Sequence, residues 1–412
     1  MEFLRHTLEN GLEGVAERNA EAHSLGLGFF VQAGSRDETD ALAGVSHFLE
    51  HMVFKGTATR TADDVNREFD DMGAHYNAFT TEENTVYYAA VLPECQPRCL
   101  DLLADILRPS LRQEDFDTEK QVIIEEIRMY EDQPPFGADD QCKATHFGSH
   151  PLSRSVLGTV ASITNLPADE MRAYFAHRYS PANMVLAAAG RVDFDQLAEQ
   201  AERVCGGWPR TAAHRRLPAA DPHSSFDVIH RPSANQQYAL QLMNGPAAED
   251  DDRFAAKLLA TIIGDDSGSR FYWELVDTGL AEQANLGHYE YQGAGVYMAY
   301  LSCEPQQAAS NLQCIANIYR QVEREGVRAE ELAQAQTKVK ARVVLSSERP
   351  RNRLFSVGGN WISQREYRSV RADLAAVDAV TVDAVQRVLA KYPLSINTTL
   401  AIGPQARIAR PQ

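Results

Sequence analysis

The sequence predicts an α+β fold with two similar domains, in which mixed or antiparallel sheets are covered by helices. Three observations support this prediction. The chain has 412 residues, more than one ordinary hydrophobic core accommodates. Short β-type runs alternate with amphipathic helical stretches along the chain. The order of these segments in the first half returns, more faintly, in the second half.

The first half of the chain contains segments of both kinds. Uninterrupted apolar runs at residues 25–32 and 184–189 predict buried strands. Apolar residues at helical spacing over residues 63–72 predict a helix with one buried face. The apolar run at residues 86–94 predicts a further strand, which leads into an amphipathic helix around residues 99–107. This mixture indicates a sheet with helices packed on it.

The second half repeats the last of these patterns. A strand-like run at residues 296–304 leads into a helical stretch around residues 309–322. Another helix is expected at residues 331–347, after an acidic turn. The repeat indicates that the two halves are built on one template.

A linker is expected between the halves. Residues 206–222 are rich in Gly, Pro and Arg and show no clear period, which is typical of a linker. We therefore expect a first domain at residues 1–208, a linker at residues 209–224 and a second domain at residues 225–412.

The composition restricts the kinds of partner. Apolar residues make up 44% of the chain, which is enough for a packed core. The 57 acidic and 40 basic residues give a formal charge of −17, and no basic stripe is present to neutralise phosphates. A nucleic-acid partner is therefore not expected. The acidic surface could attract cationic peptides or serve only to keep the protein in solution.

Cysteine usage and the N-terminus bear on location. The six cysteines show neither C-x-x-C pairs nor the dense spacing of a disulfide framework, which predicts reduced thiols. Residues 1–12 lack the apolar core of a signal peptide, and no run of about 18 apolar residues is present. A cytoplasmic protein without a membrane partner is therefore expected.

The strongest chemical signal is the run HFLEH that begins at His47. On a helix, His47 and His51 project from one face about one turn apart, so both imidazoles can reach one metal ion. Catalytic zinc takes three protein ligands and leaves a fourth position for water, beside which Glu50 can act as a base. This order is the inverse of the H-E-x-x-H metalloprotease helix. The alternative is an ordinary helix face; His146 and His150 are expected to face solvent or cap a helix.

The third ligand is expected on a second helix around residues 119–129. Glu119 and Glu126 are seven residues apart and share one face of this helix, next to an apolar stripe. Glu125 competes with Glu126 as the ligand. A solvated acidic face remains the alternative to a metal site.

Three segments resemble the M16 family of zinc peptidases, which includes pitrilysin, insulin-degrading enzyme and the mitochondrial processing peptidase. They are residues 44–57, which contain HFLEH and end in KGT, residues 77–80 (NAFT) and residues 122–129 (VIIEEIRM). The likeness is strongest over residues 7–190. It implies two homologous α/β-sandwich domains of the metallohydrolase fold of that family, with four such domains enclosing a chamber in the working assembly.

The resemblance implies roles at the predicted site. It places the metal ligands on His47, His51 and Glu126 and the base on Glu50, and it implies one zinc ion per chain. Glu126 is preferred to its neighbour because the family pairs its ligand with a second glutamate seven residues earlier, which here is Glu119. Glu119 is expected to support catalysis by holding a ligand or the attacking water in orientation.

Substrate contacts are expected on an edge strand. Residues 75–88 match the segment that the family uses beside its metal, and Asn77, Ala78 and Phe79 are expected to contact substrate. A peptide that adds to such an edge is held through its backbone, with weak sequence selection. The alternative is an ordinary hairpin with Asn77 in its turn.

The second half departs from the family pattern. Active members usually carry an Arg and a Tyr that contact the substrate, but Val276 and Glu282 occupy those positions here. Ala335 and Arg342 stand opposite the two glutamates of the first half, so only the first domain is expected to bind metal. We hypothesise that the chain is the metal-bearing subunit of a heterodimer; a homodimer is the alternative.

The function expected from these features is that of a zinc-dependent endopeptidase. It would hydrolyse unfolded peptides or short precursors within a chamber, with Glu50 activating zinc-bound water. Two alternatives belong to other classes: a non-catalytic assembly subunit with the same fold, or a peptide-binding module with a structural metal. A structural zinc normally has four protein ligands, and no fourth is evident.

Overall fold

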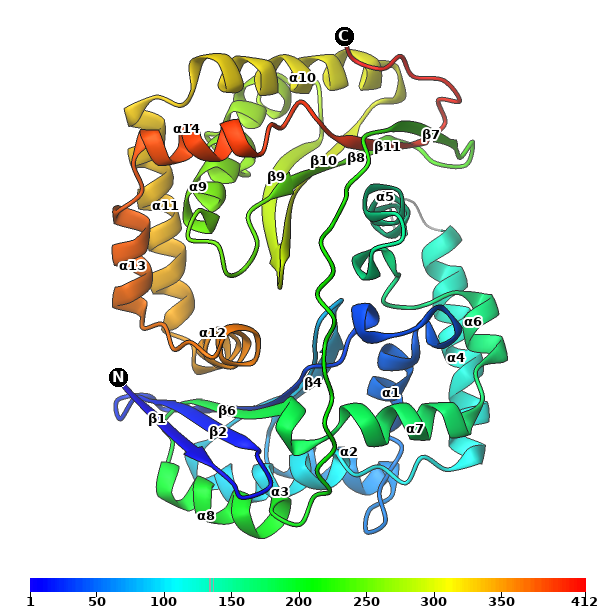
Figure 1. Cartoon of the computed structure of the whole chain (residues 1–412), viewed down its shortest axis with the longest axis vertical. Helices are drawn as coiled ribbons and strands as arrows, with labels where there is room; N and C mark the ends of the chain where they lie inside the picture. Colours follow the sequence, from blue (N-terminus) through cyan, green and yellow to red (C-terminus); the bar gives the residue numbers. More distant parts are fainter. Residues whose placement is uncertain (133–134, 136) are drawn as a thin grey trace. The chain divides into compact units, whose positions relative to one another are not determined.

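The computed structural model describes residues 1–132, 135 and 137–412, and the chain forms two compact units (Figure 1). Unit 1 consists of Met1–Arg128, Arg154–Arg216 and Val344–Ser369. Unit 2 consists of Met129–Ser153, Leu217–Val343 and Val370–Gln412. Each unit has its own sheet and its own hydrophobic core.

This division differs from the continuous one expected from the sequence. Residues 129–153 lie in the first half of the chain but belong to unit 2, and residues 344–369 lie in the second half but belong to unit 1. The linker expected at residues 209–224 is also divided, because Arg216 still belongs to unit 1. The physical reason is that each exchanged segment carries a helix whose apolar face packs on the sheet of the other half.

Unit 1 contains a six-stranded mixed sheet. From edge to edge, its strands are β1 (Glu2–Thr7), β2 (Glu13–Arg18), β6 (Met184–Gly190), β3 (Leu25–Val31), β5 (Thr85–Val91) and β4 (His75–Thr80). β2 and β6 pair in parallel, and the other neighbours are antiparallel. β3 and β6 are buried along their whole length, as their apolar sequences predict. β4 is an edge strand that pairs with β5 alone among the described strands.

Helices cover one face of this sheet and form the larger core of unit 1 with it. They are α1 (Val45–Val53), α2 (Ala62–Asp71), α3 (Gln96–Ile106), α4 (Gln113–Asp132), α6 (Val160–Asn165), α7 (Ala168–Arg178) and α8 (Phe194–Cys205). Side chains of a strand alternate between the two faces, so Leu27 and Phe29 of β3 enter this core and Phe30 enters the opposite one.

The exchanged helix α12 (Pro350–Gln364) covers the opposite face of the same sheet, where it packs on β6, β3 and β2 (Figure 1). Its apolar side chains Leu354, Val357 and Trp361 form a second core with that face. Arg353 also donates hydrogen bonds of 2.8 and 2.5 Å to the two carboxylate oxygens of Glu17, and both side chains are buried. Apolar packing and a two-pronged ion pair therefore hold α12 in register on the sheet.

The contact between α12 and the sheet depends on a glycine. A Cβ atom at Gly358 would lie 2.2 Å from a ring carbon of Phe30, whereas a Cβ at the next residue, Gly359, would meet no atom within 4 Å. Alanine is favoured over glycine inside a helix by about 1 kcal/mol.

Alanine substitutions at these neighbouring positions should therefore have opposite effects. We expect Gly359→Ala to stabilise the protein by about 0.5–1 kcal/mol. We expect Gly358→Ala to destabilise it by about 1–3 kcal/mol, because the added methyl group overpacks the contact with Phe30. Urea unfolding of the two variants measures this difference. Equal stabilities would contradict the close packing of α12.

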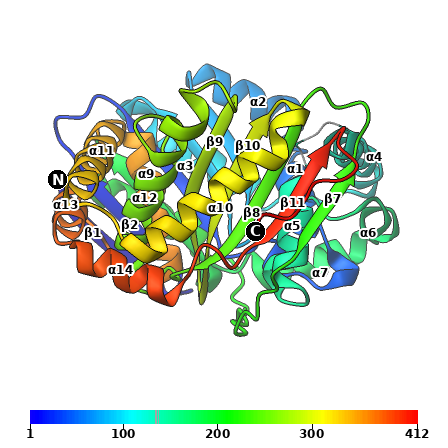
Figure 2. The same ribbon diagram turned by 90° about the horizontal axis from the view of Figure 1, so that it is seen from above.

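Unit 2 contains a five-stranded sheet. Its strands, from edge to edge, are β7 (Phe226–His230), β11 (Thr398–Gly403), β8 (Gln237–Gly245), β10 (Ala294–Cys303) and β9 (Gln283–Tyr291). β7 and β11 pair in parallel, and the other neighbours are antiparallel. The helices of this unit's main core are α9 (Arg253–Gly264), α10 (Ala308–Glu325), α11 (Ala329–Ser347), α13 (Val370–Asp378) and α14 (Val382–Lys391). Figure 2 shows α10 passing over β9 and β10.

The exchanged helix α5 (Ala138–Phe147) packs on β8 and β11 of the second sheet, in the way that α12 packs on the first. The internal repeat is also visible, because β5, α3 and α4 follow one another as β10, α10 and α11 do. The predicted α+β class with mixed sheets is confirmed. The six cysteines are free thiols. Among the described helices, none combines the length and the apolar character needed to cross a membrane.

Candidate metal centre

The helix α1 carries the HFLEH motif, and its N-terminus is tightly held. Gly44 caps it with a φ of 90°, and a Cβ atom there would lie 2.5 Å from the carbonyl oxygen of Leu157. Glycine is therefore required at this position. The carboxylate of Glu38 accepts hydrogen bonds from the backbone N–H groups of Gly44, at 2.7 Å, and Ser46, at 2.8 Å. These bonds satisfy donors that a helix N-terminus leaves free.

His47, His51 and Glu126 converge on one point. Each offers one ligand atom, and these atoms all lie within 4.8 Å of one another. The Nε2 atoms of His47 and His51 are 3.9 and 3.8 Å from the same oxygen of Glu126. These separations are too long for hydrogen bonds. Two ligands of one tetrahedral zinc ion lie roughly 3.3 Å apart, so a small contraction would bring the three atoms around an ion.

The pKa values of the two imidazoles are shifted in opposite directions. Burial and then the neighbouring His51 lower the pKa of His47 to about 3, so His47 is neutral and able to bind metal. Burial alone would lower the pKa of His51, but the hydrogen bond to Glu119 and its charge raise it overall. To bind a metal ion, Nε2 of His51 must carry no proton, while Nδ1 can stay bonded to the carboxylate of Glu119. The donor set fits zinc, which prefers imidazole and carboxylate ligands.

Glu119 orients a ligand rather than touching the reacting atoms. Its carboxylate binds His51 Nδ1 at 2.8 Å and Lys55 Nζ at 2.6 Å. Burial raises the pKa of Glu119, but these two partners outweigh it and lower the pKa overall. The charged carboxylate therefore fixes the tautomer and orientation of His51. Lys55 was not predicted from the sequence; it lies in the turn that follows α1, four residues after His51.

Glu50 lies beside the ligand cluster and is not part of it. Thr80 Oγ1, at the end of β4, donates a 2.6 Å hydrogen bond to Glu50 Oε2. Burial raises the pKa of Glu50, and the bond from Thr80 opposes this rise. A carboxylate with a raised pKa is a better proton acceptor near neutral pH than an exposed one.

A cavity of about 310 Å³ opens beside these groups. The sequence did not predict that Lys55, Ala62 and Asn66 line it. The full lining consists of Glu50, His51, Phe54, Lys55, Ala62, Asn66, Asn77, Ala78 and Glu119. The cavity thus joins the base, one metal ligand and the edge strand in a single site within unit 1.

The structure separates the three residues expected to contact substrate. Asn77 and Ala78 line the cavity, and Asn77 Oδ1 accepts a 2.9 Å hydrogen bond from the Ala78 N–H. Phe79 is 38% exposed and makes ring contacts with Tyr88 and Phe355 at the opposite face of the sheet. Asn77 lies within β4, so the alternative that placed it in a hairpin turn is wrong.

Other acidic and histidine side chains lie elsewhere. Glu125, the competing ligand candidate, has a side chain that is 70% exposed and paired with Arg128 at 2.5 Å. His146 and His150 belong to unit 2, and both are buried, so solvent exposure was a wrong expectation. His146 Nδ1 lies 3.0 Å from Thr398 Oγ1, whereas His150 Nδ1 accepts from the N–H of Leu152 and so caps a short turn. Of the two roles expected for these histidines, exposure to solvent or capping, capping is the one that His150 has.

The positions aligned with the family's Arg and Tyr lie in unit 2. Val276 packs against the main core of that unit, and Glu282, just before β9, is exposed and bonded to Gln236. Of the residues aligned with the two glutamates of unit 1, Ala335 is buried in the core of unit 2. Arg342 pairs with Asp265.

Comparison with known proteins identifies the family. Residues 14–160 match the model described as insulinase (peptidase family M16), and residues 165–339 match the peptidase M16 inactive domain. An uncharacterized zinc protease of Mycobacterium tuberculosis is 33% identical over 408 residues, covering 97% of this chain and 93% of that protein. The chain therefore belongs to peptidase family M16, as predicted, and the predicted enzyme class, a metalloprotease, is confirmed at the level of the family.

Two further comparisons extend this result. The mitochondrial-processing peptidase subunit beta of Neurospora crassa is 35% identical over 276 residues, which cover 63% of this chain and 56% of that protein. A solved structure from Pseudomonas fluorescens, described as a peptidase M16 inactive domain, superposes with a TM-score of 0.91 over all of both chains, at 19% identity. The predicted two-domain M16 fold is confirmed.

The hydrogen bond between Glu119 and His51 can be tested by metal affinity. We expect Glu119→Gln to weaken zinc binding about 10–100-fold, because an amide orients the imidazole less firmly than a carboxylate does. Glu125→Gln makes the same change on an exposed position of the same helix and should leave the affinity unchanged. Competition with a chelator measures both. Equal affinities would contradict the assigned role of Glu119.

Proposed function

We propose that this chain is a zinc-dependent endopeptidase that hydrolyses unfolded peptides or short precursors. The observation that carries the proposal is the convergence of His47, His51 and Glu126 beside Glu50, at the edge of a sheet. A scaffold subunit has no need of a ligand set with an adjacent base. The zinc protease names of the relatives agree with the proposal.

The chemistry follows from the residues around the cavity. Zinc, bound by the two histidines and Glu126, would supply a Lewis acid that polarises the scissile carbonyl and acidifies water. Glu50 accepts the proton of the attacking water and returns it to the leaving amine. The hydrogen bond from Thr80 keeps the Glu50 carboxylate aimed into the cavity. Glu119 keeps the His51 ring in place throughout.

Substrate binding is proposed at the edge of β4. An extended peptide can pair with the N–H and C=O groups of this edge, and the pairing places its backbone beside the cavity. Asn77 and Ala78 lie where the peptide would pass. Recognition through the backbone accounts for a preference for unfolded chains, because a folded protein rarely offers a free strand.

A base variant tests the mechanism. We expect Glu50→Gln to bind about one zinc ion per chain, as the wild type does, and to hydrolyse a fluorogenic peptide about 10²–10⁴-fold more slowly. The amide keeps the shape of the side chain but cannot accept the proton. Metal analysis and turnover are measured on the same preparation, so loss of zinc is not mistaken for loss of the base. Unchanged turnover would remove Glu50 from this role.

We further propose that the chain works as a dimer, either with itself or with a second M16-type subunit. Val276 and Glu282 stand where other members carry the Arg and Tyr that contact substrate, which favours a partner that supplies them. The relative from Neurospora crassa is named as a subunit, which agrees with pairing.

The partner can be tested by reconstitution. If a second subunit supplies the missing pair, the chain alone should cleave peptides slowly, and adding a co-encoded M16-type subunit should raise turnover by ~10²-fold. The same mixture made with Glu50→Gln should stay inactive, which assigns the activity to this chain. Full activity of the chain alone would exclude the need for a heterodimer.

A further inference from the structure

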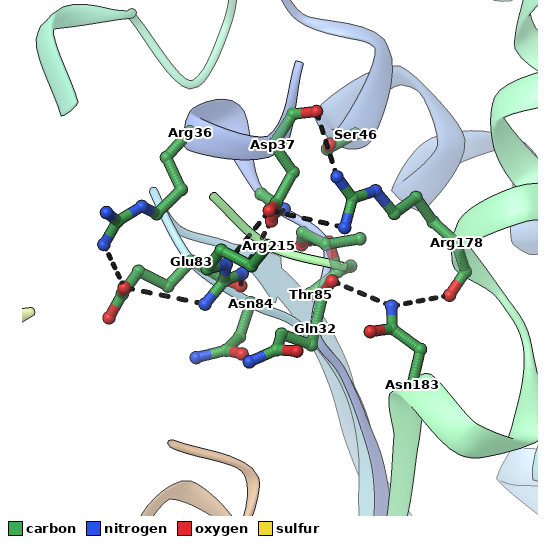
Figure 3. A network of polar contacts seen from close by, with 12 residues as sticks. Gln32, Arg36, Asp37, Ser46, Glu83, Asn84, Thr85, Arg178, Asn183 and Arg215 are labelled. Atoms are coloured by element: carbon green, nitrogen blue, oxygen red, sulfur yellow. Dashed lines mark hydrogen bonds and ion pairs between the residues drawn. The ribbon is translucent and has the colours of Figure 1, made fainter. Parts of the chain in front are cut away.

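A network of buried charged side chains lies at the loop between β3 and α1 (Figure 3). It consists of Arg36, Asp37, Glu83, Arg178 and Arg215, all within unit 1. The side chains of Arg36, Asp37 and Arg215 are 0%, 1% and 5% exposed. None of the five binds metal or lines the cavity.

Arg215 belongs to the segment expected to be a linker, and it joins two loops. Its Nε and Nη2 atoms donate to the two oxygens of Asp37 at 3.0 and 2.6 Å, which is the two-pronged geometry of a strong ion pair. Nη2 also donates to the backbone oxygen of Glu83, and Nη1 lies 3.5 Å from the Glu83 carboxylate. Asp37 is on the loop before α1, and Glu83 is in the turn between β4 and β5.

The two loops are also joined directly. The N–H of Ser35 donates to the carbonyl of Thr81 at 3.3 Å, and the N–H of Arg36 donates to the carbonyl of Glu82 at 2.9 Å. A Cβ atom at Gly34 would lie 2.4 Å from the Thr81 oxygen, which shows how closely the backbones approach. Arg215 closes this junction from the side of the linker (Figure 3).

The turn leads straight into the catalytic site. Thr80 immediately precedes the turn residues 81–84 and donates the hydrogen bond that orients Glu50. Asp37 immediately precedes Glu38, which caps the helix that carries Glu50. The donor and the acceptor of the bond between Thr80 and Glu50 are therefore attached to the two loops that Arg215 joins.

The linker segment is anchored before it reaches Arg215. The N–H of Thr211 donates to Ser180 Oγ at 2.8 Å, and Ser180 Oγ donates back to the carbonyl of Thr211 at 2.8 Å. Residues 211–215 are thus held at both ends on unit 1, and Arg216 is the last residue of this segment in the unit.

We propose that Arg215 is a positioning residue for Glu50: it holds the turn between β4 and β5 against the loop before α1 and so fixes Thr80 relative to the base. This inference rests on the proposed function. A displacement of about 1 Å at a catalytic group can reduce turnover about 10²-fold. The ligand His51 is held by Glu119, which Lys55 also contacts, and neither of these residues belongs to the network, so metal binding should not depend on Arg215.

The variant Arg215→Met should fold. The network holds three arginines and the two carboxylates of Asp37 and Glu83. Without Arg215, Arg178 remains beside Asp37 and Arg36 remains bonded to Glu83. Each of the two carboxylates therefore keeps a cation beside it. Removing one partner of a buried ion pair strongly destabilises a protein when the other charge is left unpaired, and that does not happen here.

The test compares Arg215→Met with Arg216→Met, which removes the same charge from the adjacent exposed residue. We expect Arg215→Met to lower kcat on a fluorogenic peptide about 10–100-fold, with KM changed less than kcat and zinc content unchanged. Arg215→Lys, which keeps the charge but not the planar fork, should restore part of kcat. Arg216→Met should match the wild type. Backbone hydrogen exchange at residues 34–46 and 80–85 should be faster in Arg215→Met than in the wild type. In Arg216→Met it should be as slow as in the wild type.

Several outcomes would overturn this role. Equal kcat in Arg215→Met and Arg216→Met would do so. A fall in kcat that follows a fall in zinc content would also do so, because Arg215 would then act on the metal site or on folding. A wild type that cleaves no peptide, either alone or with a second M16-type subunit, overturns the proposed function and the positioning role of Arg215 with it. Hydrogen exchange tests the contact separately: unchanged exchange in Arg215→Met would show that Arg215 does not hold the two loops together.

Discussion

The burial of one face of α1 is the constraint on which the metal centre depends. Phe48, Leu49 and Met52 are almost fully buried in the core of unit 1, so the rotation of the helix about its axis is set by packing. His47 and His51 must then emerge together on a different face, one turn apart. A small rotation of α1 would move both ligands at once and expose apolar area worth about 25 cal/mol per Å². Core packing is therefore what gives the site its precision.

Separate contacts orient the ligands and the base. The contact of Glu119 with His51 and Lys55 links α1 to α4 and governs the metal. The hydrogen bond between Thr80 and Glu50 links α1 to the edge strand and orients the side chain that we propose as the base. Substrate is expected along that same strand. Thr80, which orients Glu50, and the backbone proposed to pair with the peptide therefore belong to one element, β4.

Local periodicity predicted much of this arrangement. β3, β6, α2 and α3 were found because each buries a continuous stretch or one face, and such burial leaves a period in the sequence. The choice of Glu126 over Glu125 came instead from the family resemblance, in which the ligand is paired with a second glutamate seven residues earlier. Contacts between distant segments leave no such period: Arg215 and Asp37 are 178 residues apart, and nothing near Arg215 marks it as buried. Likewise, an apolar face on α5 or α12 can be recognised from sequence, but not the sheet that it covers.

The exchanged helices have a consequence for how such a chain can evolve. One face of the first sheet is completed by α12, which the second half of the gene encodes, and one face of the second sheet is completed by α5, which the first half encodes. Each half, inherited alone, would encode the main core of its unit but not the smaller core on the other face of its sheet. Separation of the halves into two independent genes would leave each product with one apolar face of its sheet uncovered.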